Sequence, residues 1–125
     1  MEAGQVTDLR RTRPLTQVEV EESIARVIEE MESHTEEYET LSIQAAEADA
    51  DYKRKSAHAL LAVIEHGQKM TVAERMARAD LMCNDEYRTH LITVASRNSK
   101  REYLTSLRAH LDALRTLNAS IRGQV

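Results

Sequence analysis

Residues 104–121 read LTSLRAHLDALRTLNASI, and this stretch decides the fold. Its apolar side chains recur in alternating steps of three and four residues. That spacing places them on one face of an α-helix and matches the seam between two packed helices. The stripe consists of Leu104, Leu107, Leu111, Leu114 and Ile121, with Asn118 before the last of these. We therefore expect a long helix that packs against a partner helix along this face.

A second stripe with the same spacing lies in the first half of the chain. It runs through Val20, Ile24, Val27, Met31, His34, Tyr38, Leu41, Ala45, Ala48 and Tyr52. One antiparallel register sets Val20 beside Ile121. The same register sets Tyr38 beside Leu104, so the two stripes stay in contact along their length. The sequence therefore predicts an all-α fold, a long antiparallel two-helix hairpin that resembles a coiled coil.

Helix start and stop signals divide the chain at two points. Residues 16–19, Thr-Gln-Val-Glu, form a capping box, in which each end residue accepts a hydrogen bond from the backbone amide of the other. The same signal recurs in residues 71–74, Thr-Val-Ala-Glu. Gly67 and Gly123 are placed to end the two helices, because glycine readily adopts the left-handed conformation found after a helix C-terminus.

These signals set the predicted domain organisation. We expect one helix at residues 16–66 and a second at residues 71–122, with a loop at residues 67–70 between them. Together they form one hairpin domain that spans residues 16–123. A short loop between two helices of similar length requires them to run antiparallel.

Two stretches depart from the helical pattern. Residues 1–15 lack helical periodicity and are predicted to form a flexible basic arm. The bases of this arm are Arg10, Arg11 and Arg13. The polar stretch at residues 96–101 interrupts the stripe of the second helix, which indicates a register stutter or a kink there.

The composition bounds the class of protein. The 125 residues include three Gly, one Pro, no Trp and no Phe, and 30% are charged, which is typical of long helices in one domain. Two helices alone bury little apolar area for their length, so we expect a homo-oligomer in which hairpins join into a helical bundle. The one cysteine, Cys83, is better explained as a free, partly buried thiol than as a bridge between two chains. We expect a soluble cytoplasmic protein without a membrane span.

An apolar cluster flanks the predicted loop. Its members are Leu60, Leu61, Val63, Ile64, Met70, Val72, Met76, Leu81 and Met82. This cluster is wider than the area that one partner helix covers. We therefore predict that it forms the interface with a second copy of the chain or with another protein.

Charge is divided between the two predicted helices. The net charge is −4, and acidic residues crowd positions 19–51, where Arg26 is the one base. Positions 88–122 are basic, and Glu102 and Asp112 are the only acids among them. Because the antiparallel pairing lays these segments side by side, opposite charges flank the seam and disfavour other registers.

A residual basic stripe supplies an alternative function, the binding of nucleic acid. Its members, including the arm, are Arg10, Arg11, Arg13, Arg97, Lys100, Arg101 and Arg108. Such a stripe contacts phosphates, and Tyr87 and Tyr103 are candidates to stack on bases. However, the acidic helix neutralises much of this charge, and tyrosines at helical spacing are typical of a seam. Nucleic-acid binding is therefore not the favoured interpretation.

No catalytic or cofactor motif is found in the sequence. Helical metal sites use a Glu-x-x-His spacing, which does not occur, although His34, between Glu30 and Glu37, would lie near His110 across the seam. A solvated group of side chains explains this set better than a metal site. Cys83 has no partner histidine at a cleft. We predict a protein without enzymatic activity, cofactor, metal or small-molecule substrate.

Three segments of the chain resemble small helical proteins of bacteriophages. They are residues 71–75 (TVAER), 83–87 (CNDEY) and 107–122 (LRAHLDALRTLNASIR), and the likeness covers about the last fifty residues. Proteins of this kind are often encoded in replication and recombination clusters, and they have no catalytic residues to carry over. The resemblance implies a phage accessory protein in the cytoplasm of the host cell.

The favoured hypothesis is therefore a helical interaction protein, an accessory factor in DNA recombination or replication that acts through protein–protein contacts. One alternative is a weak binder of single-stranded nucleic acid that uses the arm and the basic stripe. A further alternative is a virion or scaffold component, which predicts large assemblies rather than discrete oligomers.

Overall fold

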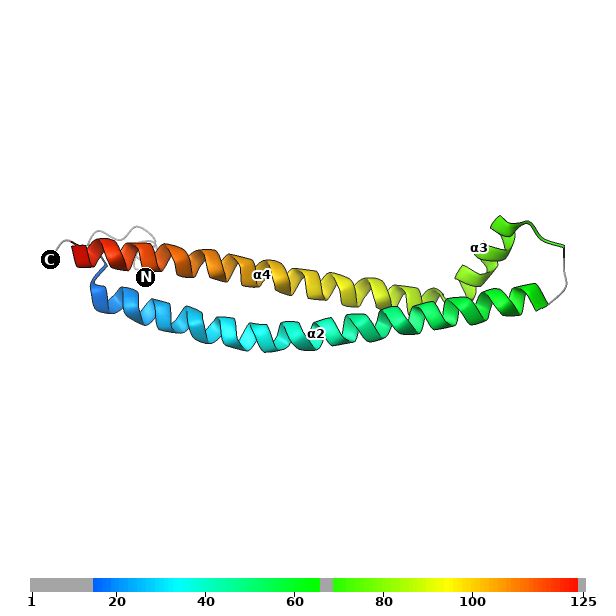
Figure 1. Ribbon diagram of the computed structural model, residues 1–125, viewed down its shortest axis with the longest axis horizontal. Helices are drawn as coiled ribbons and strands as arrows, with labels where there is room; N and C mark the ends of the chain where they lie inside the picture. The colour runs from blue at the N-terminus through cyan, green and yellow to red at the C-terminus, as the bar shows by residue number, and fades with distance from the viewer. Residues whose placement is uncertain (1–14, 66–68, 124–125) are drawn as a thin grey trace, which may run out of the picture. The chain divides into compact units, whose positions relative to one another are not determined.

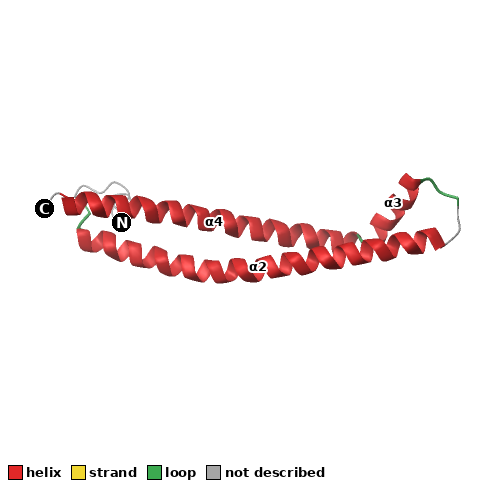
Figure 2. Ribbon diagram, in the orientation of Figure 1, coloured by secondary structure: helices red, strands yellow, loops and turns green. Residues whose placement is uncertain are grey.

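The computed structural model describes residues 15–65 and 69–123. Its helices are α2 (Gln17–Glu65), α3 (Val72–Met82) and α4 (Asn84–Gly123), in that order along the chain (Figure 1). No strand occurs among the described residues (Figure 2). The predicted all-α class is therefore confirmed.

The chain divides into two compact units. The first, here called the terminal unit, contains the described residues 15–32 and 105–123. The second, here called the central unit, contains the described residues 33–65 and 69–104. α2 and α4 each contribute to both units, and α3 belongs to the central unit alone.

Both predicted start signals cap a helix. Before α2, the Thr16 amide donates to Glu19 Oε1 at 3.2 Å, and the Glu19 amide donates to Thr16 Oγ1 at 3.2 Å. Before α3, the Glu74 amide donates to Thr71 Oγ1 at 3.1 Å. These bonds satisfy amides that have no partner within the first turn of a helix. The predicted stop signal Gly67 lies outside the described residues.

The second predicted helix, residues 71–122, is broken at Cys83, which corrects the prediction of one continuous helix. The Cys83 amide donates to Asp80 O at 3.3 Å, three residues back, and the Cys83 thiol donates to Ala79 O at 3.2 Å. The thiol thus occupies the carbonyl that the Cys83 amide would bind in a continuous helix. α4 begins at the next residue and runs unbroken through the polar stretch at residues 96–101, where a kink or stutter was predicted.

The terminal unit is held together by aliphatic side chains. Val20 is fully buried, and the other members of its core are each less than 10% exposed. This core consists of Val20, Val27, Leu107, Leu111 and Leu114. An ion pair joins Arg122 of α4 to Glu21 of α2 at 3.5 Å. Every member of this core belongs to a stripe that the sequence predicted.

The central unit has a core of smaller side chains. The buried members are Ala45, Ala59, Val63, Ala79, Cys83 and Leu104. Further contacts between α2 and α4 join His34 to Tyr103, Asp49 to His90 and Tyr52 to Tyr87. Residue numbers rise along α2 while those of the partners fall along α4, so the two helices run in opposite directions within this unit.

The register in the central unit differs from the predicted one. The sequence sets Tyr38 beside Leu104, whereas Glu37 contacts Lys100 instead. The Asp49–His90 and Tyr52–Tyr87 contacts deviate from the predicted register in the same direction but by less, so the displacement is at most about one helical turn. Polar and aromatic side chains therefore take part in setting the alignment here, together with the apolar stripe.

Candidate interaction surface

α3 carries an apolar stripe that is only half covered. Val72, Met76, Ala79 and Cys83 follow one another in steps of four, three and four residues, so they share one face. Ala79 and Cys83 are 3% and 1% exposed, whereas Val72 and Met76 are 69% and 55% exposed. The face is therefore buried at the C-terminal end of α3 and open along its first two turns.

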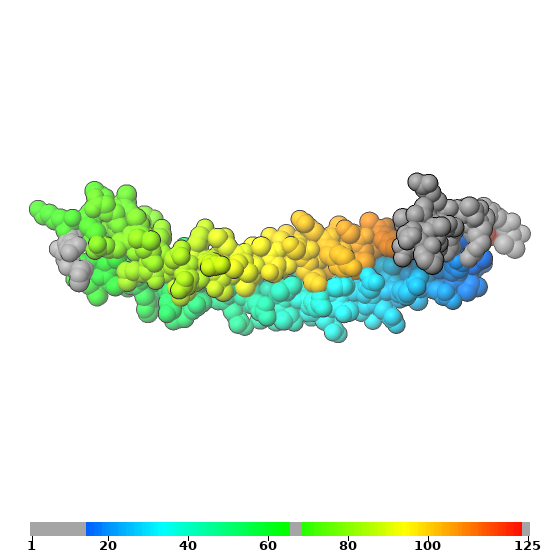
Figure 3. All heavy atoms as spheres, turned by 180° about the vertical axis from the view of Figure 1, so that it is seen from behind, coloured from blue at the N-terminus to red at the C-terminus, as the bar shows by residue number. Residues whose placement is uncertain are grey.

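The C-terminal end of α2 completes this surface. Figure 3 shows it beside α3 in green, and a pocket of about 390 Å³ lies there, lined by Ala62, Val63, Met70, Arg78 and Met82. We call the nine predicted interface residues, of which Val63, Met70 and Met82 line this pocket, the α2–α3 surface. Its lining is apolar apart from Arg78, which suits the burial of hydrocarbon rather than a chemical reaction.

The nine predicted interface residues differ in their exposure. Six are exposed, namely Leu61, Ile64, Val72, Met76, Leu81 and Met82. Leu60 and Met70 are half-buried. Val63 is 5% exposed and belongs to the core of the central unit, and it also lines the pocket. Leu81, although 79% exposed, lies on a side of α3 different from that of Val72 and Met76.

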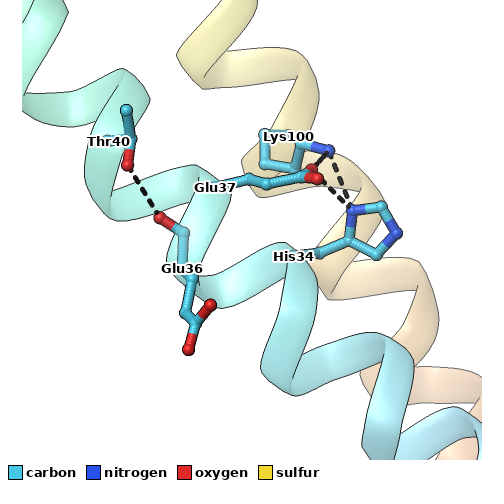
Figure 4. A network of polar contacts seen from close by, with 5 residues as sticks. All are labelled: His34, Glu36, Glu37, Thr40 and Lys100. Carbon is cyan, nitrogen blue, oxygen red and sulfur yellow. Dashed lines mark hydrogen bonds and ion pairs between the residues drawn. The ribbon is translucent and has the colours of Figure 1, made fainter.

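A polar network joins α2 to α4 within the central unit (Figure 4). Lys100 donates to a carboxylate oxygen of Glu37, and its Nζ lies 2.8 Å from His34 Nδ1. His34 Nδ1 also lies 3.1 Å from the same carboxylate oxygen, Oε2 of Glu37. The ring nitrogen takes one role at a time: unprotonated it accepts from Lys100, and protonated it donates to Glu37.

Lys100 is the main influence on the ionisation of Glu37. Its hydrogen bond, followed by its charge, lowers the pKa of the Glu37 carboxyl below the ordinary value of 4.5. The Lys100 side chain is 20% exposed, so this cation is largely engaged inside the unit. The predicted complementarity of charge between the acidic and basic segments is present here as a direct contact.

The predicted nucleic-acid contacts do not form one open basic row. Arg10, Arg11 and Arg13 lie outside the described residues. Arg97 is half-buried and donates to Asn98 Oδ1 at 3.3 Å. Lys100 is engaged by Glu37, whereas Arg101 and Arg108 are exposed. The structure therefore leaves fewer cations available along α4 than the sequence suggests.

The two tyrosines of this stripe contact other rings. Tyr103 packs edge-on against His34, with ring centroids 4.7 Å apart. Tyr87 lies 5.1 Å from Tyr52, measured between centroids, and the Tyr52 ring is also stacked on His90 at 5.8 Å. These contacts agree with the interpretation of the tyrosines as seam residues, although 43% of Tyr87 and 44% of Tyr103 remain exposed.

The described part of the chain contains no group of three or more His, Cys, Asp and Glu side chains suited to a metal ion. None of its helices has a segment of the length and apolarity required to cross a membrane.

Comparisons with protein-family models, with curated proteins and with solved structures give no match to this chain. The resemblance to helical phage proteins therefore stays a prediction.

Proposed function

We propose that this chain is a helical interaction protein without enzymatic activity. In this proposal α2 and α4 form an antiparallel hairpin, and the α2–α3 surface joins two copies of the chain into a helical bundle. The assembled bundle then binds another protein. The observation that carries the proposal is the half-covered stripe of α3, in which Val72 and Met76 are exposed on the face that buries Ala79 and Cys83.

The spacing of this stripe supports a helix as its occupant. Steps of four and three residues are the pattern by which one helix packs against another. A second copy offers the same stripe, so a two-fold axis would pair Val72 and Met76 with their own equivalents. The pocket between α2 and α3 is lined by apolar side chains apart from Arg78, and exposed apolar surface is a common feature of interfaces between proteins.

The small core of the central unit supports the same proposal. Half of its buried side chains are alanines, which remove little apolar surface from water when they are buried. Additional burial against a second copy would therefore add substantially to the stability of this unit. A phage accessory role in recombination or replication, as the resemblance implies, is the proposed biological setting.

The proposal is tested by a pair of valine substitutions. Val72→Glu places a carboxylate on the open stripe, in the first turn of α3, where a negative charge suits the helix dipole. Val18→Glu is the matched control, because Val18 is 63% exposed in the first turn of α2, behind the equivalent capping box. We expect the wild-type chain and Val18→Glu to form the same discrete oligomer, and Val72→Glu to raise the dissociation constant at least about tenfold.

Light scattering coupled to size exclusion measures the mass, and circular dichroism verifies that helix content is unchanged. A wild-type chain that stays monomeric at high micromolar concentration would rule out self-association. Large polydisperse assemblies would instead favour the scaffold alternative.

Fluorescence anisotropy with single-stranded and duplex oligonucleotides, at low and high salt, tests the alternative that the chain binds nucleic acid directly. We expect no saturable binding, because Lys100 is already engaged by Glu37. Binding that weakens steeply with salt would instead support the basic stripe as the functional surface.

A further inference from the structure

We propose that a pocket at the junction of α3 and α4 binds an organic cation, that is, an ammonium or guanidinium group. The pocket has a volume of about 320 Å³ and is lined by Tyr52, Asp80, Asn84 and Tyr87. It lies within the central unit and involves none of the residues of the α2–α3 surface. The inference therefore stands independently of the proposed self-association.

The break at Cys83 creates this pocket. Asp80 lies in the last turn of α3 and Asn84 is the first residue of α4, so the break brings two different helix ends to one place. Tyr87 follows one turn later on α4. Tyr52 comes from α2, and its ring is fixed by the contacts with Tyr87 and His90. The walls thus come from three helices.

The lining offers groups that attract positive charge. It consists of a carboxylate, an amide and two phenol rings, and it includes no Lys, Arg or His. Among the described residues, none forms an ion pair or hydrogen bond with the Asp80 carboxylate. Aromatic rings attract cations through their electron-rich faces, and a nearby carboxylate adds a full negative charge.

The end of α3 strengthens this negative character. The C-terminal end of a helix carries a partial negative charge, which basic residues usually offset. The last turn of α3 contains no basic residue and contains Asp80 instead. Burial, and after it the charge of Asp80, raises the pKa of Tyr52 above the ordinary value of 10.0. Of these two causes, the charge of Asp80 is the one that would also favour a cation in this pocket.

The shape of the pocket favours an organic cation over a metal ion. A Ca²⁺ or Mg²⁺ site requires several oxygen ligands converging at short distance, whereas this lining supplies one carboxylate. Two aromatic walls match the apolar surface of an alkylammonium or guanidinium group. A lysine or arginine side chain of a partner protein has the same chemistry as a free alkylammonium ion.

The probe for this site is tetramethylammonium chloride, with sodium chloride at equal ionic strength as the reference. Titration is followed by NMR of the tyrosine rings, which are few, because the chain has four Tyr and neither Trp nor Phe. We expect saturable shifts of the Tyr52 and Tyr87 resonances, with a dissociation constant of roughly millimolar magnitude. Shifts that are linear in concentration, or equal in sodium chloride, would overturn the proposal.

Two pairs of variants locate the binding. Asp80→Asn keeps the shape and removes the charge, and it is expected to weaken binding about fivefold. Asp112→Asn, on α4 in the terminal unit, is the control for the change of charge and should leave binding unchanged. Tyr87→Leu is expected to weaken binding about threefold. Tyr103→Leu is its control, because Tyr103 has nearly the same exposure, 44% against 43%.

Binding retained by Asp80→Asn at wild-type strength would reject the assignment. Because that substitution is nearly isosteric, it keeps the test valid even if Tyr87→Leu disturbs the packing. A failure here also leaves self-association of the α2–α3 surface unaffected, since that is measured without the ammonium probe.

Discussion

The terminal unit and the central unit use the same two helices but are held together by different chemistry. In the terminal unit, valines and leucines fill the seam, and each core member is less than 10% exposed. In the central unit, alanines and Cys83 make up most of the core, and His34, Tyr52 and Lys100 are half-buried at the contacts between α2 and α4. The change occurs within continuous helices, so it reflects the side chains and not the backbone.

The two kinds of core contribute differently to the free energy of folding and to the alignment of the two helices. Burial of a leucine stabilises by about 1.5–3 kcal/mol, and an alanine contributes much less. Polar contacts add little net stability but penalise a shifted register, because a slip leaves charges without partners. We infer that the terminal unit supplies most of the free energy of folding, whereas the central unit fixes the alignment and supplies the surfaces for binding.

The largest expected effect is on the terminal seam. Leu111→Ala should lower the free energy of unfolding by about 3 kcal/mol, because the side chain is 5% exposed and its removal leaves a cavity. Leu117→Ala, in the same helix at 37% exposure, is the matched control and should lose about 1 kcal/mol or less. Urea unfolding followed by circular dichroism measures both. Equal losses would show that the terminal seam is not the main source of stability.

The next effect concerns the small side chains of the central seam. Ala45 is 2% exposed, so Ala45→Leu should force a bulky group between packed helices and lower the free energy of unfolding by about 2 kcal/mol. Ala46→Leu changes the next residue, which is exposed, and should have little effect because both residues favour helix. The same urea experiment applies. A stabilised Ala45→Leu variant would instead reveal unfilled space in the central seam.

The contrast between the units also explains which features were predictable from sequence. Capping boxes and apolar stripes act locally, so the starts of α2 and α3 and the leucines of the terminal core follow from residue spacing alone. The break at Cys83 does not, because cysteine is not a typical helix breaker and the thiol bond to Ala79 O is a feature of the folded chain. The acidic first turn of α4, Asp85 and Glu86, was the available signal of a new helix start.

The candidate sites were predictable to a similar, partial extent. The excess of apolar residues near the loop predicted the cluster that we propose as an interface, but the burial of Val63 depends on packing between helices. The pocket at the junction of α3 and α4 was not predicted from the sequence. Its walls come from residues as distant in sequence as Tyr52 and Tyr87, and Asp80 joins them only because the helix breaks. Sequence spacing carries no information about such a convergence.

A smaller effect is expected from the helix caps, and it compares the two units directly. Thr16→Ala removes the capping box of α2 and should lower the free energy of unfolding by about 1 kcal/mol. Thr71→Ala removes the cap of α3, an eleven-residue helix, and should mainly increase local fraying. Hydrogen exchange is expected to accelerate in α3 for Thr71→Ala while the amides of α2 keep their protection. Faster exchange throughout the central unit would mean that α3 unfolds together with α2.

The smallest expected effect concerns one polar contact between α2 and α4 in the central unit, the ion pair of Glu37 and Lys100. Glu37→Gln removes the charge that Lys100 engages and should destabilise the protein modestly at pH 7. Since the folded-state pKa of Glu37 is lowered by Lys100, the stabilisation is fully present above the unfolded value of 4.5 and is lost as the pH falls from there through the folded-state pKa. The wild-type and variant unfolding curves should therefore converge between pH 5 and strongly acidic conditions.

Glu36→Gln is the control for this experiment, because the adjacent Glu36 carboxylate points away from Lys100 (Figure 4). Its free energy of unfolding should stay close to that of the wild-type chain at every pH. The other carboxyl groups are protonated in both proteins alike, so their contribution cancels in the comparison. A Glu37→Gln difference that does not shrink in acid would mean that its cause is not the ion pair. The alignment of the central unit would then rest on its ring contacts and on the packing of its small side chains, and the difference between the two units would not depend on this ion pair.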